Sequence, residues 1–280
     1  RGGAKVEEQN ICSYVQSCRK QHLYTCKLYF KERTMINTAY AGNAKMFDGI
    51  LISALSTVKH TSEAMTVYLL TMDMTDVSPL YEPLSECHRA FLEEIYKSAN
   101  ENSRVILADM GEYYRQTLKN SPNGENEYTP YAFLRLYLPR IEHLDKVLYL
   151  DTDTVICNDI SPLYNTDISD YEYAAALDYY GKVFMGYKYI NSGVMLMNLD
   201  KIRKTGLFSK AIVLCGQKKL FLPDQTAIHR LTSSKLILEN KFNEQKHYDR
   251  ESTVIQHFAK TILWLPWFHT RNIKPWECER

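Results

Sequence analysis

The chain has 280 residues, of which 45% are hydrophobic and 24% are charged, and its formal net charge is +1. This length suffices for one large domain or two small ones, and the composition is that of a globular chain, which excludes an intrinsically disordered protein. The small net charge argues against a dedicated nucleic-acid binder, because little excess positive charge is available to neutralise phosphates.

Residues 1–34 form a basic segment with seven Lys or Arg and three Asp or Glu. We interpret them as a leader of unknown role before a single domain over residues 35–280. The leader's charge suits contact with an anionic membrane surface, and a solvated segment without a partner is the alternative. No apolar stretch resembling a signal peptide follows the charged first residues, and no apolar run reaches the ~18–20 residues that span a bilayer. The seven cysteines show no CxxC, which fits reduced thiols in the cytoplasm.

From residue 35 onward, apolar runs alternate with helical spacing. Residues 35–40 predict a strand that ends in the turn Ala41-Gly42-Asn43. Residues 47–58 predict a helix, 65–72 a second strand, 80–96 a second helix and 104–108 a third strand. This order is the signature of βαβ units with a parallel sheet, and unbroken apolar runs indicate strands that are covered on both faces.

The next stretch leads to a candidate site. Residues 119–127 are a loop by composition, and residues 131–138 have helical spacing that stops at Pro139. Residues 147–150 predict a fourth buried strand that runs directly into Asp151. In an open α/β sheet, ligands bind at the carboxyl ends of the strands.

Asp151 and Asp153 occupy this strand end. If the chain stays extended, side chains two residues apart point the same way, so the two carboxylates converge. A divalent cation resolves their mutual repulsion, and hard oxygen ligands suit Mn²⁺ or Mg²⁺. The alternative is a solvated turn after a strand, since such acidic triplets are common.

Six collinear stretches, taken together, resemble glycosyltransferase family 8, the retaining enzymes that include bacterial lipopolysaccharide galactosyl- and glucosyltransferases and glycogenin. They are residues 36–43, 131–136, 148–154 and 189–199, Leu222-Pro223-Asp224-Gln225, and Ile255-Gln256-His257-Phe258 with Lys274-Pro275-Trp276.

The resemblance implies a GT-A fold, with a Rossmann-like, mostly parallel central sheet flanked by helices. It also implies a retaining, metal-dependent hexosyltransferase that uses Mn²⁺, with Mg²⁺ as a substitute, and takes UDP-glucose or UDP-galactose as donor. The expected acceptor is a glycan or lipid-linked glycan, such as a bacterial surface glycan. From the cysteines and the basic leader we expect a location in the cytoplasm, at the inner face of the membrane. The sequence does not specify the acceptor or the oligomeric state.

The resemblance also implies site residues. Asp151, Asp153 and His257 would hold the metal. The nucleotide would contact Ala39, Tyr40, Asn43, Asp151, Thr152, Asp153 and Lys274, the last through the diphosphate. The donor sugar and the catalytic centre would be surrounded by Arg135, Asp178, Asn191, Asp224 and Gln225.

Several of these residues have a purely structural alternative. Asn191 could be a turn former, and Asp224, which follows Pro223, could be a helix cap. Arg135 could belong to a surface ion pair, and Lys274 could be an exposed lysine.

Two stretches depart from the family pattern. The first loop, residues 40–43, lacks the acidic residue that commonly reads the nucleobase. In the last motif, His257 lies far before Lys274, whereas His269 lies only five residues before it. We favour His257 as the third metal ligand because it follows an apolar pair that predicts a strand, whereas residues 264–272 read as an inserted, aromatic-rich loop.

Two other functions compete with the glycosyltransferase. The residues around Asp151 also fit the motif of haloacid-dehalogenase-like phosphatases, in which the first Asp is the nucleophile. That motif normally opens its domain, whereas here about 150 residues precede it. A non-catalytic nucleotide-sugar-binding relative is the other alternative, because a fold does not fix a function.

Overall fold

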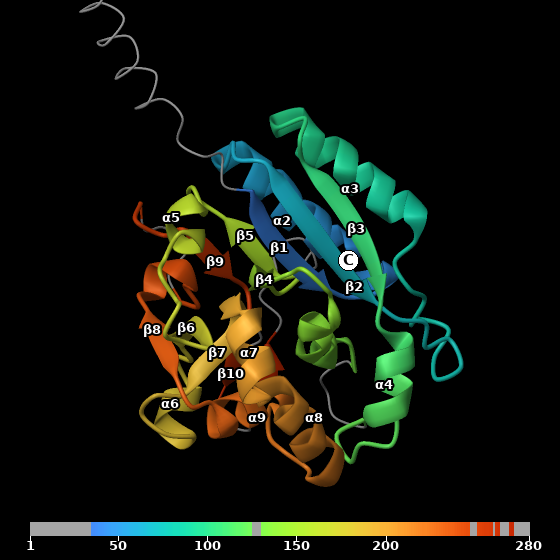
Figure 1. Cartoon of the computed structure of the whole chain (residues 1–280), viewed down its shortest axis with the longest axis vertical. Helices are drawn as coiled ribbons and strands as arrows, with labels where there is room; N and C mark the ends of the chain where they lie inside the picture. The colour runs from blue at the N-terminus through green and yellow to red at the C-terminus, as the bar shows by residue number, and fades with distance from the viewer. Residues whose placement is uncertain (1–34, 125–129, 247–250, 260, 264–268, 272–280) are drawn as a thin grey trace, which may run out of the picture. The chain divides into compact units, whose positions relative to one another are not determined.

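A seven-stranded sheet with the strand order β3-β2-β1-β4-β7-β6-β8 forms the centre of the fold (Figure 1). The structure is a computed structural model that describes residues 35–124, 130–246, 251–259, 261–263 and 269–271, so residues 1–34 lie outside the described part. The strands of the sheet are β1 (Ile36–Ala41), β2 (Met65–Thr71), β3 (Arg104–Asp109), β4 (Lys146–Leu150), β6 (Tyr173–Leu177), β7 (Ile190–Asn198) and β8 (Lys235–Leu238). Two small antiparallel pairs accompany the sheet, β5 (Thr154–Ile156) with β9 (Ile255–His257) and β10 (Thr261–Leu263) with β11 (His269–Arg271).

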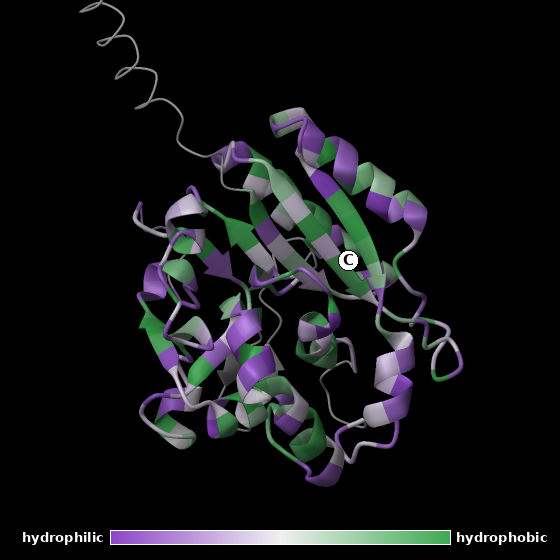
Figure 2. Cartoon of the chain, viewed as in Figure 1, coloured by the Kyte–Doolittle hydropathy of each residue, from purple (hydrophilic) through white to green (hydrophobic). Residues whose placement is uncertain are grey.

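Helices cover both faces of the sheet. One face packs on α2 (Phe47–His60), α3 (Glu86–Ala99) and the short α5 (Ser161–Tyr164). The other packs on α4 (Gly111–Thr117), the 3-10 helix η2 (Pro130–Arg140), α7 (Leu199–Thr205), α8 (Leu207–Gln217) and α9 (Pro223–Leu231). Short elements lie in the connections, namely η1 (Ala44–Met46), α6 (Gly181–Phe184) and η3 (Asn240–Phe242). Figure 2 shows the contrast between strand β3, which is mostly hydrophobic, and helix α3, which mixes hydrophilic and hydrophobic residues.

Strand β4 shows why its sequence is an unbroken apolar run. Val147 and Tyr149 belong to the core on one face, while Leu148 and Leu150 belong to the core on the other. Successive side chains of a strand point to opposite faces, so a strand that is buried on both faces must be apolar throughout. The prediction of doubly covered strands is confirmed for β4.

The sheet is mostly parallel, as predicted, with one reversal. β1, β2, β3 and β4 are parallel neighbours, whereas β7 runs antiparallel to both β4 and β6. Because of this reversal, the beginning of β7 lies beside the carboxyl ends of β4 and β6. One edge of the sheet therefore collects residues 151–153, Asp178 and residues 191–193.

The predicted strands and helices up to residue 150 are present, and two differ in detail, while residues 125–127 of the predicted loop lie outside the described residues. The helix predicted over residues 80–96 begins only at Glu86, because Ser85 caps it by accepting a hydrogen bond from the backbone of His88. Residues 130–140 form a 3-10 helix that runs through Pro139 instead of stopping there. None of the helices in the described residues is long and apolar enough to cross a membrane.

Candidate active site

The acidic pair lies in a tight turn between β4 and β5. The backbone N–H of Asp151 donates to the carbonyl oxygen of Gly193 (2.7 Å), and the Oγ1 hydroxyl of Thr154 donates to the carbonyl oxygen of Asp151 (2.9 Å). The two carboxylates do converge, but the expected extended conformation is wrong, because residues 152 and 153 form a turn. The turn places both carboxylates at the strand end without any need for strand periodicity.

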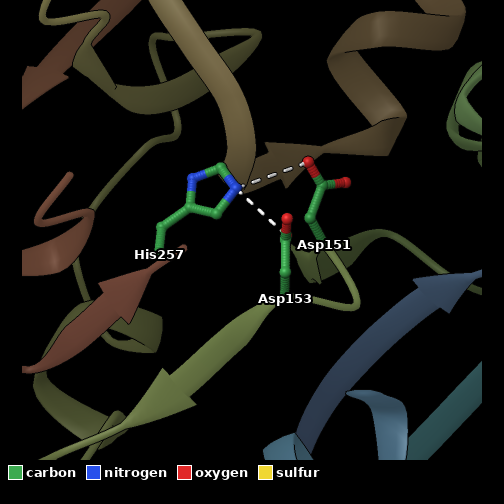
Figure 3. Close-up of side chains that lie close together, drawn as sticks. All are labelled: Asp151, Asp153 and His257. Atoms are coloured by element: carbon green, nitrogen blue, oxygen red, sulfur yellow. Dashed lines mark ion pairs between the residues drawn. The ribbon is translucent and has the colours of Figure 1, made fainter. Parts of the chain in front are cut away.

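His257 completes a group of three side chains with Asp151 and Asp153 (Figure 3). Its Nε2 lies 3.2 Å from Oδ1 of Asp153 and 3.8 Å from Oδ2 of Asp151. One ligand atom from each residue can be chosen so that all three lie within 4.8 Å of one another. Two carboxylates and an imidazole in this arrangement fit a divalent cation such as Mn²⁺.

Strand pairing fixes the position of His257. β9 pairs antiparallel with β5, so that His257 lies opposite Thr154, and the N–H of Phe258 donates to the carbonyl oxygen of Asp153 (2.8 Å). The His257 side chain is only 3% exposed. Its ring also depends on Gly193, since an ideal Cβ at position 193 would lie 2.1 Å from Cε1 of His257.

Opposite charges stabilise the group formed by Asp151, Asp153 and His257. Burial lowers the pKa of His257, but Asp153 and Asp151 more than offset this effect, so the pKa is raised above its ordinary value. Without a bound cation, a proton on His257 can therefore neutralise part of the negative charge of the two carboxylates. A metal that binds here must compete with that proton.

Arg135 lies beneath the acidic turn, in η2. Its guanidinium forms ion pairs with Asp151 (2.9 Å) and Asp224 (3.1 Å), and it also donates to the carbonyl oxygen of Ser192. Although burial lowers its pKa, the surrounding carboxylates raise it well above the ordinary value. The side chain is only 4% exposed, so the surface ion pair considered as an alternative is wrong.

A second polar group adjoins the acidic turn. Oδ2 of Asp178 accepts hydrogen bonds from Nδ2 of Asn191 (3.1 Å) and Nε2 of Gln225 (3.2 Å), and Oε1 of Gln225 accepts the N–H of Ser192 (2.9 Å). All four residues are less than 10% exposed. The structure thus brings together Arg135, Asp178, Asn191, Asp224 and Gln225 beside Asp151, as the resemblance implies, while their catalytic roles stay predictions.

The residues predicted to contact the nucleoside are placed less favourably. Tyr40 is fully buried, and its hydroxyl lies 3.0 Å from Oγ of Ser53, while Ala39 lies in the core on the other face. Because β1 buries both side chains, only backbone groups of these two residues could face a nucleotide. Asn43 is 1% exposed, and its Nδ2 donates to the carbonyl oxygen of Leu80 (3.4 Å).

Other predicted residues have simpler outcomes. Thr152 lies in the acidic turn, and its carbonyl oxygen packs so closely on Gly49 that a Cβ there would come within 2.2 Å. Asp224 lies in the first turn of α9, whose N-cap is Leu222, and it is buried and paired with Arg135, so it is not a cap. Residues 269–271 form strand β11, so the predicted loop over residues 264–272 is wrong at these positions. Lys274 lies outside the described residues.

Two residues of the site were missed. The hydroxyl of Tyr149 donates to Oδ1 of Asp151 (2.9 Å), and its ring lies under the guanidinium of Arg135. Its position two residues before Asp151 on a strand was a usable signal. Asn243 contacts both His257 and Asn191, and nothing in the sequence around it indicates a polar centre.

Comparison with known proteins shows the family of the chain. The sequence profile described as glycosyl transferase family 8 matches residues 37–279. The chain is 26% identical over 221 residues to glycosyltransferase GlyE of Streptococcus pneumoniae TIGR4, covering 78% of this chain and 50% of GlyE. It is 32% identical over 106 residues to glycosyltransferase GlyA of the same strain, covering 37% of this chain and 15% of GlyA. The chain thus spans half or less of the length of these two relatives.

Solved structures with the same architecture include LgtC and GlyE. A galactosyltransferase LgtC in complex with donor and acceptor sugar analogues aligns with a TM-score of 0.62 at 20% identity, covering 79% of this chain and 86% of LgtC. The GlyE structure aligns with a TM-score of 0.59 at 20% identity, covering 85% of this chain and 58% of GlyE. These likenesses confirm the predicted GT-A fold.

Proposed function

The chain belongs to glycosyl transferase family 8, and on that premise we propose that it is a metal-dependent, retaining hexosyltransferase that uses UDP-glucose or UDP-galactose. The observation that supports this proposal most is the meeting of Asp151, Asp153 and His257 at a sheet edge. Three protein ligands leave coordination positions for diphosphate oxygens, as a nucleotide-sugar donor requires. The acceptor in this proposal is a glycan or a lipid-linked glycan.

The chemistry is the departure of a nucleoside diphosphate from the anomeric carbon of the donor. A bound Mn²⁺ would neutralise the negative charge that develops on the leaving group. Lys274 would add a second positive charge to the diphosphate. Arg135 holds Asp151 in place and supplies a fixed positive charge below the acidic turn.

The buried amide and carboxylate groups would orient the donor sugar. Asp178, Asn191 and Gln225 already satisfy one another, so their geometry exists before any substrate arrives. Gln225 is a poor candidate for a nucleophile, because its amide oxygen accepts two hydrogen bonds from Ser192. We therefore favour a front-face displacement, in which the acceptor enters on the side from which the diphosphate leaves.

The proposal includes where in the cell the enzyme acts. Among the described residues, Cys87, Cys157 and Cys215 are free thiols, and free thiols are compatible with a reducing compartment. We propose a cytoplasmic enzyme that contacts the membrane surface through the basic residues 1–34.

Calorimetry with UDP, GDP and ADP, each with and without Mn²⁺, tests the proposal together with an assay of donor hydrolysis. We expect tight binding of UDP only with Mn²⁺, and hydrolysis of UDP-glucose or UDP-galactose. Equal, metal-independent binding of all three nucleotides would overturn it. Hydrolysis of p-nitrophenyl phosphate without any nucleotide would favour the phosphatase instead, and binding without turnover would favour the non-catalytic relative.

A further inference from the structure

Asn243 is a buried amide that joins two parts of the site. It follows η3 and is 1% exposed. Its Oδ1 lies 3.0 Å from Nδ1 of His257, and its Nδ2 donates to Oδ1 of Asn191 (3.0 Å). The backbone carbonyl oxygen of the next residue, Glu244, accepts the backbone N–H of His257 (2.9 Å). This backbone hydrogen bond fixes the position of the Asn243 side-chain amide beside strand β9.

The orientation of the Asn191 amide is set by groups whose hydrogen-bonding roles cannot be exchanged. The backbone N–H of Gly193 can only donate, and it donates to Oδ1 of Asn191 (3.0 Å). At the other end, Nδ2 of Asn191 donates to the carboxylate of Asp178 (3.1 Å), which accepts. Both neighbours require the same assignment of oxygen and nitrogen in Asn191.

The orientation of the Asn191 amide determines that of the Asn243 amide. Because Oδ1 of Asn191 only accepts, Asn243 must turn its NH₂ group toward Asn191. Its carbonyl oxygen then faces His257 and also only accepts. Nδ1 of His257 must therefore carry a proton, which leaves the lone pair of the neutral ring on Nε2.

We propose that Asn243 is a positioning residue that fixes the tautomer of His257, so that the Nε2 lone pair faces the carboxylates of Asp151 and Asp153. In the neutral ring this tautomer turns the Nε2 lone pair toward the two carboxylates, 3.2 and 3.8 Å away, so that all three groups can stabilise a cation bound between them. The consequence for metal binding rests on the proposed function. The tautomer itself does not, because it follows from Gly193, Asn191 and Asn243.

The test compares two substitutions, of which only one keeps an acceptor for Nδ1 of His257. Asn243→Leu removes the acceptor for Nδ1 while keeping a similar volume, and Asn243→Asp keeps an acceptor oxygen. Nitrogen-15 NMR of the His257 ring, in metal-free protein at a pH where the ring is neutral, reports the tautomer. Titration with Mn²⁺ alone reports the affinity of the site.

We expect the Nδ1–H tautomer in the wild-type protein and in Asn243→Asp, and the Nε2–H tautomer in Asn243→Leu. The Leu variant should also bind Mn²⁺ about 10–100-fold more weakly, the scale for loss of an outer hydrogen-bond partner of a metal ligand. Asn123→Leu is the matched control, because Asn123 is another buried amide, bonded to Cys215 and Lys218 far from His257 in sequence. It should lower stability without changing the tautomer or the affinity for Mn²⁺.

The outcomes distinguish the role of Asn243 from the proposed metal dependence. A wild-type protein with the Nε2–H tautomer, or a folded Leu variant that keeps the Nδ1–H tautomer, would overturn the role of Asn243. A wild-type protein with the Nδ1–H tautomer that fails to bind Mn²⁺ would support the role of Asn243 and overturn the proposed metal dependence. The measurement on the wild-type protein decides even if the Leu variant does not fold.

Discussion

The imidazole of His257 occupies the space that a side chain at position 193 would need. An ideal Cβ at Gly193 would lie 2.1 Å from Cε1 and 2.7 Å from both ring nitrogens of His257. Atoms cannot approach so closely, and Asn243 contacts the ring at Nδ1. The His257 ring can therefore lie where it does only because residue 193 is glycine.

Gly193→Ala is therefore expected to displace His257 and to weaken Mn²⁺ binding by at least about 10-fold, as damage to a metal site does. Overpacking costs about 1–3 kcal/mol, so the fold should survive. Calorimetric titration with Mn²⁺ and a thermal melt check both points. Gly216→Ala is the control, because its Cβ would meet its nearest neighbour, the carbonyl oxygen of Thr117, at an ordinary 3.6 Å. Unchanged Mn²⁺ affinity in Gly193→Ala would contradict the structure.

Asp151→Asn and Asp153→Asn should each remove most donor hydrolysis but should differ in stability. Asp151 also pairs with buried Arg135, so its loss should cost about 1–3 kcal/mol, less than for a fully buried pair because Asp151 is 27% exposed. Asp153→Asn leaves both ion pairs of Arg135 in place and should melt close to the wild-type temperature. Thermal melts and turnover of the donor check this, and full turnover in either variant would end the proposed metal site.

Replacing each candidate histidine by Ala separates His257 from His269. His257→Ala should raise the Mn²⁺ concentration for half-maximal donor hydrolysis by at least the about 10–100-fold that loss of an outer partner causes, because the ligand itself is lost. His269→Ala should leave that concentration unchanged. The opposite pattern would show that the metal is held from the other side of the insertion.

The linkage of the product tests retention. An α-linked donor sugar should give an α-linked product, which the anomeric proton signal in NMR identifies. Product formed without enzyme serves as the blank for spontaneous reaction. A β-linked product would be incompatible with the proposed front-face displacement.

The pH dependence of stability should depend on His229. Burial, with Lys235 and Arg230, lowers the pKa of His229 to about 4. As the pH falls below the ordinary pKa of about 6.5, the unfolded chain takes up a proton that the folded chain takes up only near pH 4. The free energy of unfolding should therefore fall across this window, with about 1 kcal/mol due to His229 after allowance for solvent screening of a partly exposed group.

Urea unfolding at about pH 7 and about pH 5 measures this loss. His229→Gln should lose less stability than the wild-type protein over the same interval. His143→Asn is the control, since His143 is exposed and has a positive φ that asparagine tolerates. Equal losses in the wild-type protein and His229→Gln would assign the effect to other groups.

Much of the fold was predictable because local patterns determined it. The apolar run of β4 and the helical spacing of α2 both report burial directly. The reversal of β7 was not predictable from its sequence, because a buried strand has the same apolar pattern in either direction. That direction depends on pairing with β4 and β6, which the residues of β7 alone do not specify.

Some residues of the site could likewise be predicted from the sequence, whereas others could not. Asp151 and Asp153 follow a strand whose end could be recognised, and the family motifs supplied Asn191 and Gln225. The full burial of Tyr40 and the contacts of Asn243 arise only from packing between distant segments. A residue type alone carries no information about such contacts.

The pairing of β5 with β9 has a consequence for how the chain reaches its folded state. It brings together Asp153 and His257, which are about 100 residues apart in sequence. Closing so long a loop costs chain entropy before any contact repays it, so this pairing should form late in folding. A cation that binds only the closed arrangement would shift the equilibrium toward it by mass action. Residues 240–246 and 251–258 should then exchange their amide hydrogens more slowly with Mn²⁺ than with a chelator, because the metal holds β9 against β5.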